Sequence, residues 1–301
     1  MAMKQDKIIF ALTSNPKLAK KVSETLDIEL GKSQIERFSD GEIICRCLSE
    51  VRNKTVYLIQ STSYPQIEKI FEILVFVDAL KNKGAKEIVL VIPYYGYSRQ
   101  DRVAKEGEPI TAKMVASLYQ NAGINKIITI DLHTPGIKDF FNIPVTNINP
   151  TKLFADYFRA YFDERGIKNE DLVIVTPDHG SNTRVKEIAQ YFEGSSLVFV
   201  EKRRPVPNES KIISIVGNPR DKYCLLLDDI IDTGGTINHV VDALLKKNAK
   251  EVYVGATHGI FSKGGLDSRI KHIVVSDTIE KNIEGVRVIS VDKLISKEIE
   301  G

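Results

Sequence analysis

The sequence has few cysteines, no long apolar run and almost no excess of charge. Its three cysteines among 301 residues are too few, and odd in number, for the disulfide framework of a small secreted domain. No stretch approaches the roughly 18 apolar residues of a membrane-spanning helix. The apolar run 8–12 is too short for the core of a signal peptide. We therefore expect a cytoplasmic protein that has no membrane partner.

The two signs of charge nearly cancel. Lysine and arginine number 42 and aspartate and glutamate 40, which leaves a net charge of +2. This charge is too small for a protein organised around a nucleic-acid backbone, so we expect no nucleic-acid partner. Apolar residues at 43% and charged residues at 27% are ordinary for soluble globular proteins. Any site for a polyanion must therefore be local.

Two common nucleotide-binding motifs are also missing. Residues 31–33 read Gly-Lys-Ser, like the end of a P-loop, but the position that should hold its first glycine is Leu26. The pattern G-x-G-x-x-G does not occur anywhere in the chain. Both Walker-type nucleotide binding and Rossmann-type dinucleotide binding are therefore disfavoured.

Short β-branched runs alternate with amphipathic stretches along the chain. The runs are residues 56–60, 88–92, 127–130, 172–175, 225–227 and 252–254. Strands that alternate with helices predict an α/β fold with parallel sheets. One of the intervening stretches, residues 66–83, is apolar nearly all round and is followed by Gly84, which predicts a helix buried on two sides.

The chain divides into two stretches of comparable α/β content near residue 148. We expect an N-terminal domain at 1–148 and a C-terminal domain at 149–301, with the last residues as candidates for packing back on the N-terminal domain. Polar or glycine-rich residues follow five of the predicted strands, at 94–96, 131–133, 177–180, 228–229 and 257–259. Ligands of open parallel sheets bind beyond the carboxyl ends of the strands, so the chemistry is expected there.

Residues 225–236 carry the strongest local signal. An apolar strand leads into Asp228 and Asp229, then into a turn with Gly234 and Gly235, and a helix begins near Thr236. Glycines let backbone amides approach a phosphate, and the helix N-terminus adds unpaired N–H groups. The carboxylates would repel phosphate, but they can accept hydrogen bonds from sugar hydroxyls or hold Mg²⁺. The segment predicts a sugar-phosphate site; a capped turn with solvated acids is the alternative.

Residues 227–236 resemble the phosphoribosyl-diphosphate loop of the type I phosphoribosyltransferase fold. Further segments stand in the order seen in ribose-phosphate diphosphokinases, and the similarity runs from about residue 8 to residue 294. These segments are Phe38–Glu42, Pro93–Arg102, Asp131–His133, Pro177–Gly180 and Lys202–Pro205. The resemblance implies two similar phosphoribosyltransferase-like domains, each a mainly parallel sheet flanked by helices. It also implies a site at their junction and a homohexamer assembled from dimers.

The activity that the resemblance implies is transfer of the β,γ-diphosphoryl group of ATP to the 1-hydroxyl of ribose 5-phosphate, which releases AMP. Such a transfer depends on in-line positioning and on neutralising charge at phosphate oxygens, for which Mg²⁺ is the implied cofactor. A phosphoribosyltransferase that consumes the product and a non-catalytic regulatory homologue are the alternatives. Neither alternative is favoured by the intact segments at 38–42, 99–100 and 202–204.

The resemblance also assigns roles to individual residues. Phe38, Asp40 and Glu42 recognise adenine from a neighbouring subunit, with an exposed turn as the alternative. Arg99, Gln100 and Asp101 contact ATP, and His133 helps to hold Mg²⁺ with the nucleotide. Asp178 lies near a second metal position, while Lys202 and Arg204 close over the transferring group. The ribose 5-phosphate residues are Asp228, Asp229, Asp232, Thr233, Gly234, Gly235 and Thr236.

The adjacent Asp228 and Asp229 also invite interpretation as a general base, which we leave unassigned. The chain departs from the family at its end, because it stops at Gly301 without the Ser- and Phe-containing tail that helps to form an ADP site in many relatives. As a hypothesis, ADP competes here mainly with ATP. ADP inhibition that persists at saturating ATP would contradict this.

Overall fold

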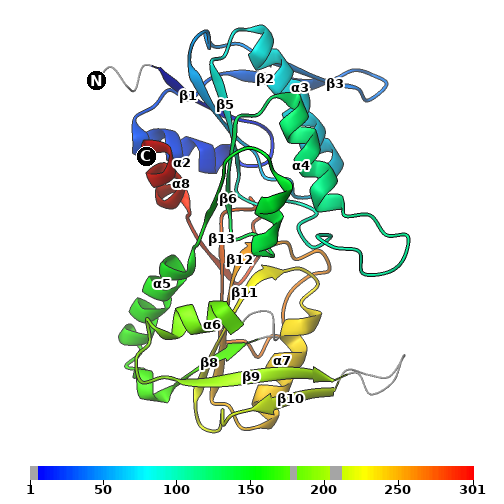
Figure 1. Cartoon of the computed structure of the whole chain (residues 1–301). Coiled ribbons are helices and arrows are strands. Elements are labelled where there is room, and N and C mark those ends of the chain that lie inside the picture. The colour runs from blue at the N-terminus through cyan, green and yellow to red at the C-terminus, as the bar shows by residue number, and fades with distance from the viewer. Residues whose placement is uncertain (1–5, 177–181, 204–211) are drawn as a thin grey trace. The chain divides into compact units, whose positions relative to one another are not determined.

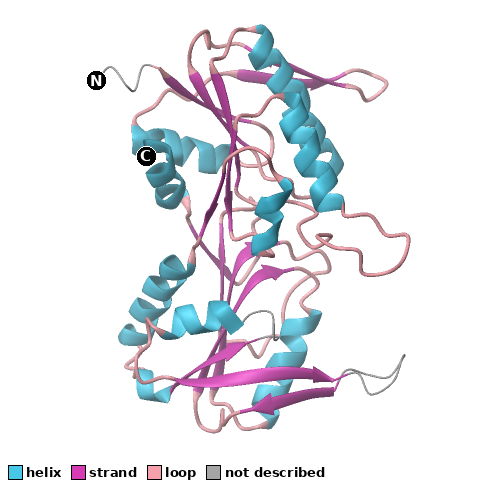
Figure 2. Ribbon diagram, in the orientation of Figure 1, coloured by secondary structure: helices cyan, strands magenta, loops and turns pink. Residues whose placement is uncertain are grey.

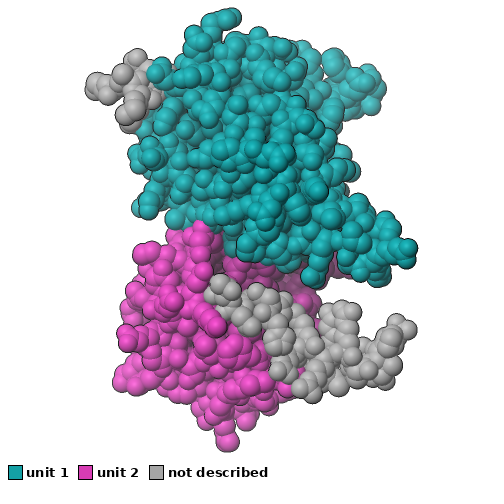
Figure 3. Space-filling view, in the orientation of Figure 1, with its two compact units in different colours: residues 1–148, 277–280, 290–301 teal, residues 149–276, 281–289 magenta. Residues whose placement is uncertain are grey.

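The computed structural model describes residues 6–176, 182–203 and 212–301 (Figure 1). The chain divides into two compact units (Figure 3). The N-terminal unit comprises residues 1–148, 277–280 and 290–301, and the C-terminal unit comprises residues 149–276 and 281–289. The backbone therefore passes from one unit to the other at residues 148/149, 276/277, 280/281 and 289/290.

The N-terminal unit is built on a parallel sheet with the strand order β1-β4-β5-β6-β7; the strands are magenta in Figure 2. Its strands are β1 (Lys7–Ala11), β4 (Thr55–Ile59), β5 (Glu87–Ile92), β6 (Lys126–Ile130) and β7 (Val145–Ile148). Its helices are α2 (Pro16–Leu26), α3 (Gln66–Asn82), α4 (Thr111–Ala122), the 3₁₀ turn η1 (Pro135–Phe140) and α8 (Asp292–Glu300). Figure 1 shows α2 and α8 on one face of this sheet and α3 and α4 on the other.

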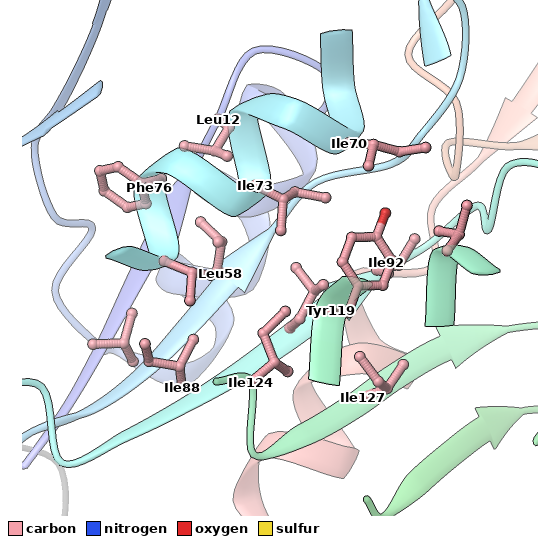
Figure 4. Close-up of a cluster of buried hydrophobic side chains, with 14 of the residues drawn as sticks. Leu12, Leu58, Ile70, Ile73, Phe76, Ile88, Ile92, Tyr119, Ile124 and Ile127 are labelled. Atoms are coloured by element: carbon pink, nitrogen blue, oxygen red, sulfur yellow. The ribbon is translucent and has the colours of Figure 1, made fainter. Parts of the chain in front are cut away.

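The core of this unit lies between the sheet and the α3–α4 layer. Ile73 and Phe76 of α3 and Tyr119 of α4 are completely buried, and they meet Leu58 of β4 and Ile88 of β5 (Figure 4). Burial of such side chains removes apolar surface from water, which stabilises the folded state. The strands are nearly continuous apolar runs because both faces of the sheet are covered.

Helix α3 is the predicted all-round apolar helix. The chain buries one side of it, with Ile73, Phe76 and Leu80 at 0% exposure, whereas Ile67 remains 74% and Phe71 51% exposed. Among the described residues, only one side of α3 is therefore covered, and the two-sided burial expected from the sequence is not reached there. No helix among the described residues, α3 included, is both long and apolar enough to cross a membrane.

An antiparallel hairpin of β2 (Ser33–Arg37) and β3 (Ile43–Cys47) packs against α3. Cys45 lies on its inner side, and its Sγ is 3.9 Å from the carbonyl oxygen of Glu72. Burial raises the pKa of the Cys45 thiol to about 11, so it stays protonated at neutral pH. This cysteine is a packing residue.

The C-terminal unit contains a larger sheet with the order β10-β9-β8-β11-β12-β13-β14. It is parallel except for β10, which pairs antiparallel with β9. The strands are β8 (Leu172–Thr176), β9 (Ser196–Arg203), β10 (Ile212–Val216), β11 (Tyr223–Ile231), β12 (Glu251–Gly259), β13 (His272–Ser276) and β14 (Val286–Ile289). Its helices are α5 (Thr151–Glu164), η2 (Asn169–Asp171), α6 (Asn182–Ala189) and α7 (Gly235–Lys246).

Two hydrophobic clusters cover the faces of this sheet. Phe154, Phe158 and Phe162 of α5 pack with Leu225 and Leu227 on one face. On the other face, the apolar side of α7 buries its positions at helical spacing, namely Ile237, Val240, Val241 and Leu244. The helix predicted to begin near Thr236 is confirmed, since α7 starts at Gly235.

The central strands β11 and β12 are longer than the sequence predicts. They were expected to end at residues 227 and 254, but they remain paired to Ile231 and Gly259. Neighbouring strands pair with β11 only through Leu226 and with β12 only through Ala256. The two strands continue beyond the rest of the sheet because each still supplies the other with a hydrogen-bonding partner. Asp228 and Asp229 therefore lie within a strand, not after it.

Candidate active site

The turn after β11 has the local geometry of an anion site. Gly234 is the residue before α7 and has φ 77°, a left-handed conformation that favours glycine. A Cβ at Gly234 would also lie 2.7 Å from Leu266 Cδ2. A Cβ at Gly235 would meet only Thr233 Oγ1, at 3.6 Å, so the backbone there faces open space. The first amides of α7, where the helix dipole is positive, can thus be reached by a phosphate.

The two acids on β11 have different surroundings. Successive residues of a strand point to opposite faces, so Asp228 and Asp229 do not act as a side-by-side carboxylate pair. Asp229 is 9% exposed, and its backbone N–H donates to Asp228 Oδ1 at 3.0 Å. Asp228 borders a small pocket whose lining residues are Pro150, Thr151, Phe154, Arg184, Leu227, Asp228, Ala256 and Thr257. The pocket brings an arginine and an aspartate together at the carboxyl end of the sheet.

The sequence patterns do not single out Arg184. It lies in the first turn of α6 and lines the pocket beside Asp228. Its position just before the apolar positions of that helix gave no sign that the side chain faces the acid-bearing strand. The only available signal was its closeness in sequence to the Pro177–Gly180 segment.

In the N-terminal unit, the loop after β5 carries the predicted ATP residues. Arg99 and Gln100 are exposed, and Gln100 Oε1 accepts a hydrogen bond from Thr111 Oγ1 at 2.6 Å. Asp101 Oδ2 accepts from Thr134 Oγ1 at 2.7 Å. Because Thr134 follows His133 directly, this bond ties the loop after β5 to the loop after β6. The structure thus brings residues 99–101 and 133 to the same edge of one sheet.

The predicted adenine residues lie on the turn of the β2–β3 hairpin. Phe38 is 53% exposed, and Asp40 and Glu42 are exposed as well. The turn is closed by hydrogen bonds from Phe38 N to Glu42 O at 2.9 Å and from Gly41 N to Phe38 O at 2.9 Å. The fold therefore presents an aromatic ring and two carboxylates to the outside of the unit.

Asp178 and Arg204 lie outside the described residues. Lys202 lies in β9, where its backbone pairs with Ile213 of β10.

The described residues contain no group of three or more His, Cys, Asp or Glu side chains that could hold a metal ion. Mg²⁺ commonly takes one or two protein carboxylates together with substrate phosphates and water, so the carboxylates of Asp228 and Asp229 on β11 suit that mode of binding.

Comparison with known proteins relates both units to one enzyme family. The model for the N-terminal domain of ribose phosphate pyrophosphokinase matches residues 7–123. The phosphoribosyl transferase domain model matches residues 144–293. Ribose-phosphate pyrophosphokinase 1 of Streptococcus agalactiae is 44% identical over 301 aligned residues, which cover 97% of this chain and 92% of that protein. The chain belongs to the ribose-phosphate pyrophosphokinase family.

Other relatives agree with this assignment. The ribose-phosphate pyrophosphokinase of Bacillus caldolyticus is 44% identical and covers 97% of this chain and 93% of its own length. The crystal structure of phosphoribosylpyrophosphate synthetase from Mycobacterium smegmatis superposes with a TM-score of 0.90 at 33% identity, over 98% of each chain. The resemblance and the two-domain phosphoribosyltransferase-like fold expected from the sequence are confirmed.

Proposed function

We propose that the protein transfers the β,γ-diphosphoryl group of ATP to the 1-hydroxyl of ribose 5-phosphate, forming phosphoribosyl diphosphate and AMP. The observation that carries this proposal is the turn at residues 232–236, where an acid-bearing strand meets the glycine-lined N-terminus of α7 in a chain of this family. ATP and ribose 5-phosphate are the proposed substrates, and the product supplies nucleotide biosynthesis.

The ribose 5-phosphate site is proposed at this turn. The amides at Gly234 and Gly235 and the hydroxyls of Thr233 and Thr236 would hold the 5-phosphate, because N–H and O–H groups donate to phosphate oxygens. Asp228 and Asp229 would accept hydrogen bonds from the ribose diol, and Asp232 is the third carboxylate proposed for this site. Carboxylates near a phosphate are favourable only when they face hydroxyls or a cation, which sets the expected orientation of the sugar.

The ATP site is proposed at the carboxyl edge of the N-terminal sheet. Arg99 would bind phosphate oxygens through its guanidinium fork, supported by Gln100 and Asp101. Phe38, Asp40 and Glu42 would recognise adenine on a second copy of the chain, the ring by stacking and the acids by accepting from the amino group. This arrangement makes the active enzyme an oligomer, for which we propose a homohexamer built from dimers.

Mg²⁺ is the proposed cofactor: His133 would help to hold it with the nucleotide, and Asp178 would lie near a second metal position. When bound, the ion neutralises charge on the transferring phosphates. Lys202 and Arg204 would add cations where negative charge develops in the transition state. The protein's own contribution is to fix the two substrates in line, since phosphoryl transfer needs little covalent help.

The cytoplasm is the proposed site of action. The three cysteines are free, and burial raises the pKa of Cys45 to about 11 and that of Cys224 to about 12. Because the cysteines form no disulfide, the fold does not depend on an oxidising environment. Free, protonated thiols are typical of proteins in a reducing compartment.

An AMP-release assay tests the proposal. The purified protein is incubated with ATP, Mg²⁺ and ribose 5-phosphate, with and without a nitrogenous base. We expect AMP and phosphoribosyl diphosphate in equal amounts without any base. Absence of AMP under all conditions would identify a non-catalytic homologue. Turnover only when a base and phosphoribosyl diphosphate are supplied would identify a phosphoribosyltransferase.

A further inference from the structure

Two buried hydroxyls follow strand β4, and no part of the proposed chemistry uses them. Ser61 and Thr62 are both 0% exposed. Burying a hydroxyl costs free energy unless hydrogen bonds within the protein replace those it made to water. Both residues belong to the N-terminal unit, as do all their partners described below. Their bonds converge on the backbone of the loop that carries Arg99 and Gln100.

Thr62 forms hydrogen bonds to the start of this loop at two residues, Tyr94 and Gly96. Its Oγ1 accepts a hydrogen bond from the N–H of Gly96 at 2.6 Å and donates to the carbonyl of Tyr94 at 3.2 Å. Its own N–H also donates to the Tyr94 carbonyl, at 3.0 Å. The approach is so close that a Cβ at Gly96 would lie 2.3 Å from the Thr62 carbonyl oxygen. Glycine at 96 and threonine at 62 therefore form one fitted contact.

Ser61 holds the same loop from the preceding position and anchors it to the other end of the chain. Its Oγ accepts from the N–H of Tyr94 at 3.0 Å and donates to the carbonyl of Thr278 at 2.6 Å. Asn15 stabilises this contact between Ser61 and Thr278 because it bonds both residues. Its Nδ2 donates to the Thr278 carbonyl at 3.1 Å, and its Oδ1 accepts from Ser61 N at 2.8 Å.

Further backbone hydrogen bonds fix the rest of the loop as far as Gln100. Tyr97 has φ 65°, a left-handed conformation that costs energy in a non-glycine residue. Gln100 N donates to the Tyr97 carbonyl at 2.8 Å, and the Gln100 carbonyl accepts from Ala112 N at 3.1 Å. Tyr95 OH also donates to the Ala112 carbonyl, at 2.9 Å. The backbone from 94 to 100 is thus fixed at Thr62, Ser61 and the start of α4, with a strained turn between.

We propose that Ser61 and Thr62 are positioning residues for ATP: their hydroxyls hold the 94–100 backbone in the shape that presents Arg99 and Gln100 to the nucleotide. The inference rests on the proposed function, which assigns Arg99 and Gln100 to ATP. Neither hydroxyl needs to touch the substrate, because Ser61 acts through the Tyr94 amide and Thr62 through the Gly96 amide.

Thr62→Val tests the proposal by removing the hydroxyl with little change of shape. The Gly96 amide then loses its acceptor, and we expect the KM for ATP to rise by about tenfold, the factor for one lost hydrogen bond. The KM for ribose 5-phosphate should stay within about twofold. Calorimetric titration with a non-hydrolysable ATP analogue gives the same comparison without turnover, and amide exchange at Gly96 should accelerate. Thr62→Ser, which restores the hydroxyl, should recover ATP affinity.

Thr129→Val is the matched control. Thr129 is a buried threonine of β6 in the same unit, and its hydroxyl has no hydrogen-bond partner among the described residues. The substitution should leave both KM values unchanged. If Thr62→Val does not fold, Ser61→Ala carries the test, with a smaller rise in the KM for ATP alone.

Three results would overturn the inference. An equal change in both KM values, a fall in kcat with neither KM moved, or a failure of Thr62→Ser to recover ATP affinity would show a merely structural role. Arg99→Ala separates this from failure of the proposed function. If Arg99→Ala weakens ATP and Thr62→Val does not, the positioning role is wrong. If Arg99→Ala leaves ATP binding intact, the assignment of Arg99 itself fails.

Discussion

The two units of the molecule shape the same edge of the same kind of sheet by different means. In the C-terminal unit, the edge is formed by backbone, with Gly234 and Gly235 leaving amides accessible at the start of α7. In the N-terminal unit, the edge is formed by buried polar side chains, of which Gln60, Ser61 and Thr62 are each 0% exposed. A phosphate is recognised well by bare amides, whereas a loop that presents side chains must itself be held from below.

The N-terminal network extends to a buried acid on α3. Glu72 is 2% exposed, and its carboxylate accepts from Thr13 Oγ1 at 2.5 Å, Gln60 Nε2 at 2.7 Å and Lys69 Nζ at 3.1 Å. A buried charge persists only when it is paired and hydrogen-bonded, and this one is both. The comparison predicts that substitutions at the C-terminal edge impair function without loss of stability, while those in the N-terminal network reduce stability or alter positioning.

The largest effect is expected at the proposed catalytic cations, which belong to neither pattern. Lys202→Ala or Arg204→Ala should lower turnover by at least about 10²-fold, since cations at developing charge contribute roughly 10³ to 10⁵ in comparable phosphoryl transfers. Ribose 5-phosphate binding should hardly change, because the cations act in the transition state. Steady-state kinetics and calorimetric titration measure the two quantities. Near-normal turnover would remove both residues from the mechanism.

Gly235→Ala tests the backbone cradle. The new Cβ has room in the protein itself, so thermal stability should be kept, and alanine even favours the helix. The methyl group would, however, stand where the phosphate approaches the amides, and the KM for ribose 5-phosphate should rise by about tenfold or more. Gly265→Ala, at another glycine with open surroundings, is the control. Equal kinetics in the two variants would contradict a phosphate site at this turn.

Glu72→Gln tests the N-terminal network. The amide has one acceptor oxygen where the carboxylate had two, and it leaves Lys69 without its ionic partner. We expect the free energy of unfolding to fall by about 1 kcal/mol, measured by urea denaturation. Glu68→Gln, one turn earlier on α3, removes an ion pair with Arg37 whose two side chains are each 45% exposed, and its effect should be smaller. Equal losses in the two variants would show that burial of the network contributes nothing.

The smallest effect concerns pH and the C-terminal unit. His272 stacks on Tyr161 with ring centroids 4.4 Å apart, and its Nε2 lies 2.7 Å from Tyr157 OH. Burial, with Arg287 and Arg165 adding repulsion, holds the pKa of this imidazole below its ordinary value. The unfolded chain, whose histidine titrates near 6.5, binds more protons below that pH, so stability falls as the solution is acidified.

His272→Phe should reduce this pH dependence while keeping a ring against Tyr161. Melting temperatures of the variant and the parent protein between pH 7.5 and 5 give the comparison. We expect the parent to lose more stability than the variant on acidification. Parallel curves would show that His272 does not contribute.

Much of the fold could be predicted from local patterns. The apolar runs at 56–60, 88–92 and 172–175 match β4, β5 and β8 to within one residue at each end, because a strand covered on both faces must be apolar throughout. The extension of β11 through Asp228 and Asp229 could not be predicted, because it depends on pairing with β12. Polar residues in a strand carry no local sign that a partner strand continues beside them.

The site was predictable where the chemistry requires a distinctive residue at a distinctive spacing. Gly234 and Gly235 after a strand are such a case, and the structure places them at the start of α7. Ser61, Thr62 and Arg184 could not be found in this way. Their importance comes from partners far away in sequence, such as Thr278 for Ser61, and isolated serines, threonines and arginines resemble many others.

The alternating path of the backbone has a consequence for any attempt to divide the protein. Helix α8 packs on α2, and Ile295 and Ile299 are at most 2% exposed there. A fragment truncated after Ile148 would lack α8 and the Thr278 carbonyl. The apolar side of α2 that α8 covers would then be exposed to water, and the Asn15 side-chain amide would lose the Thr278 carbonyl as its acceptor. Gene fission at the apparent midpoint would thus yield halves that need each other in order to fold, whereas circular permutation that links the original termini through a flexible tether would preserve every such contact.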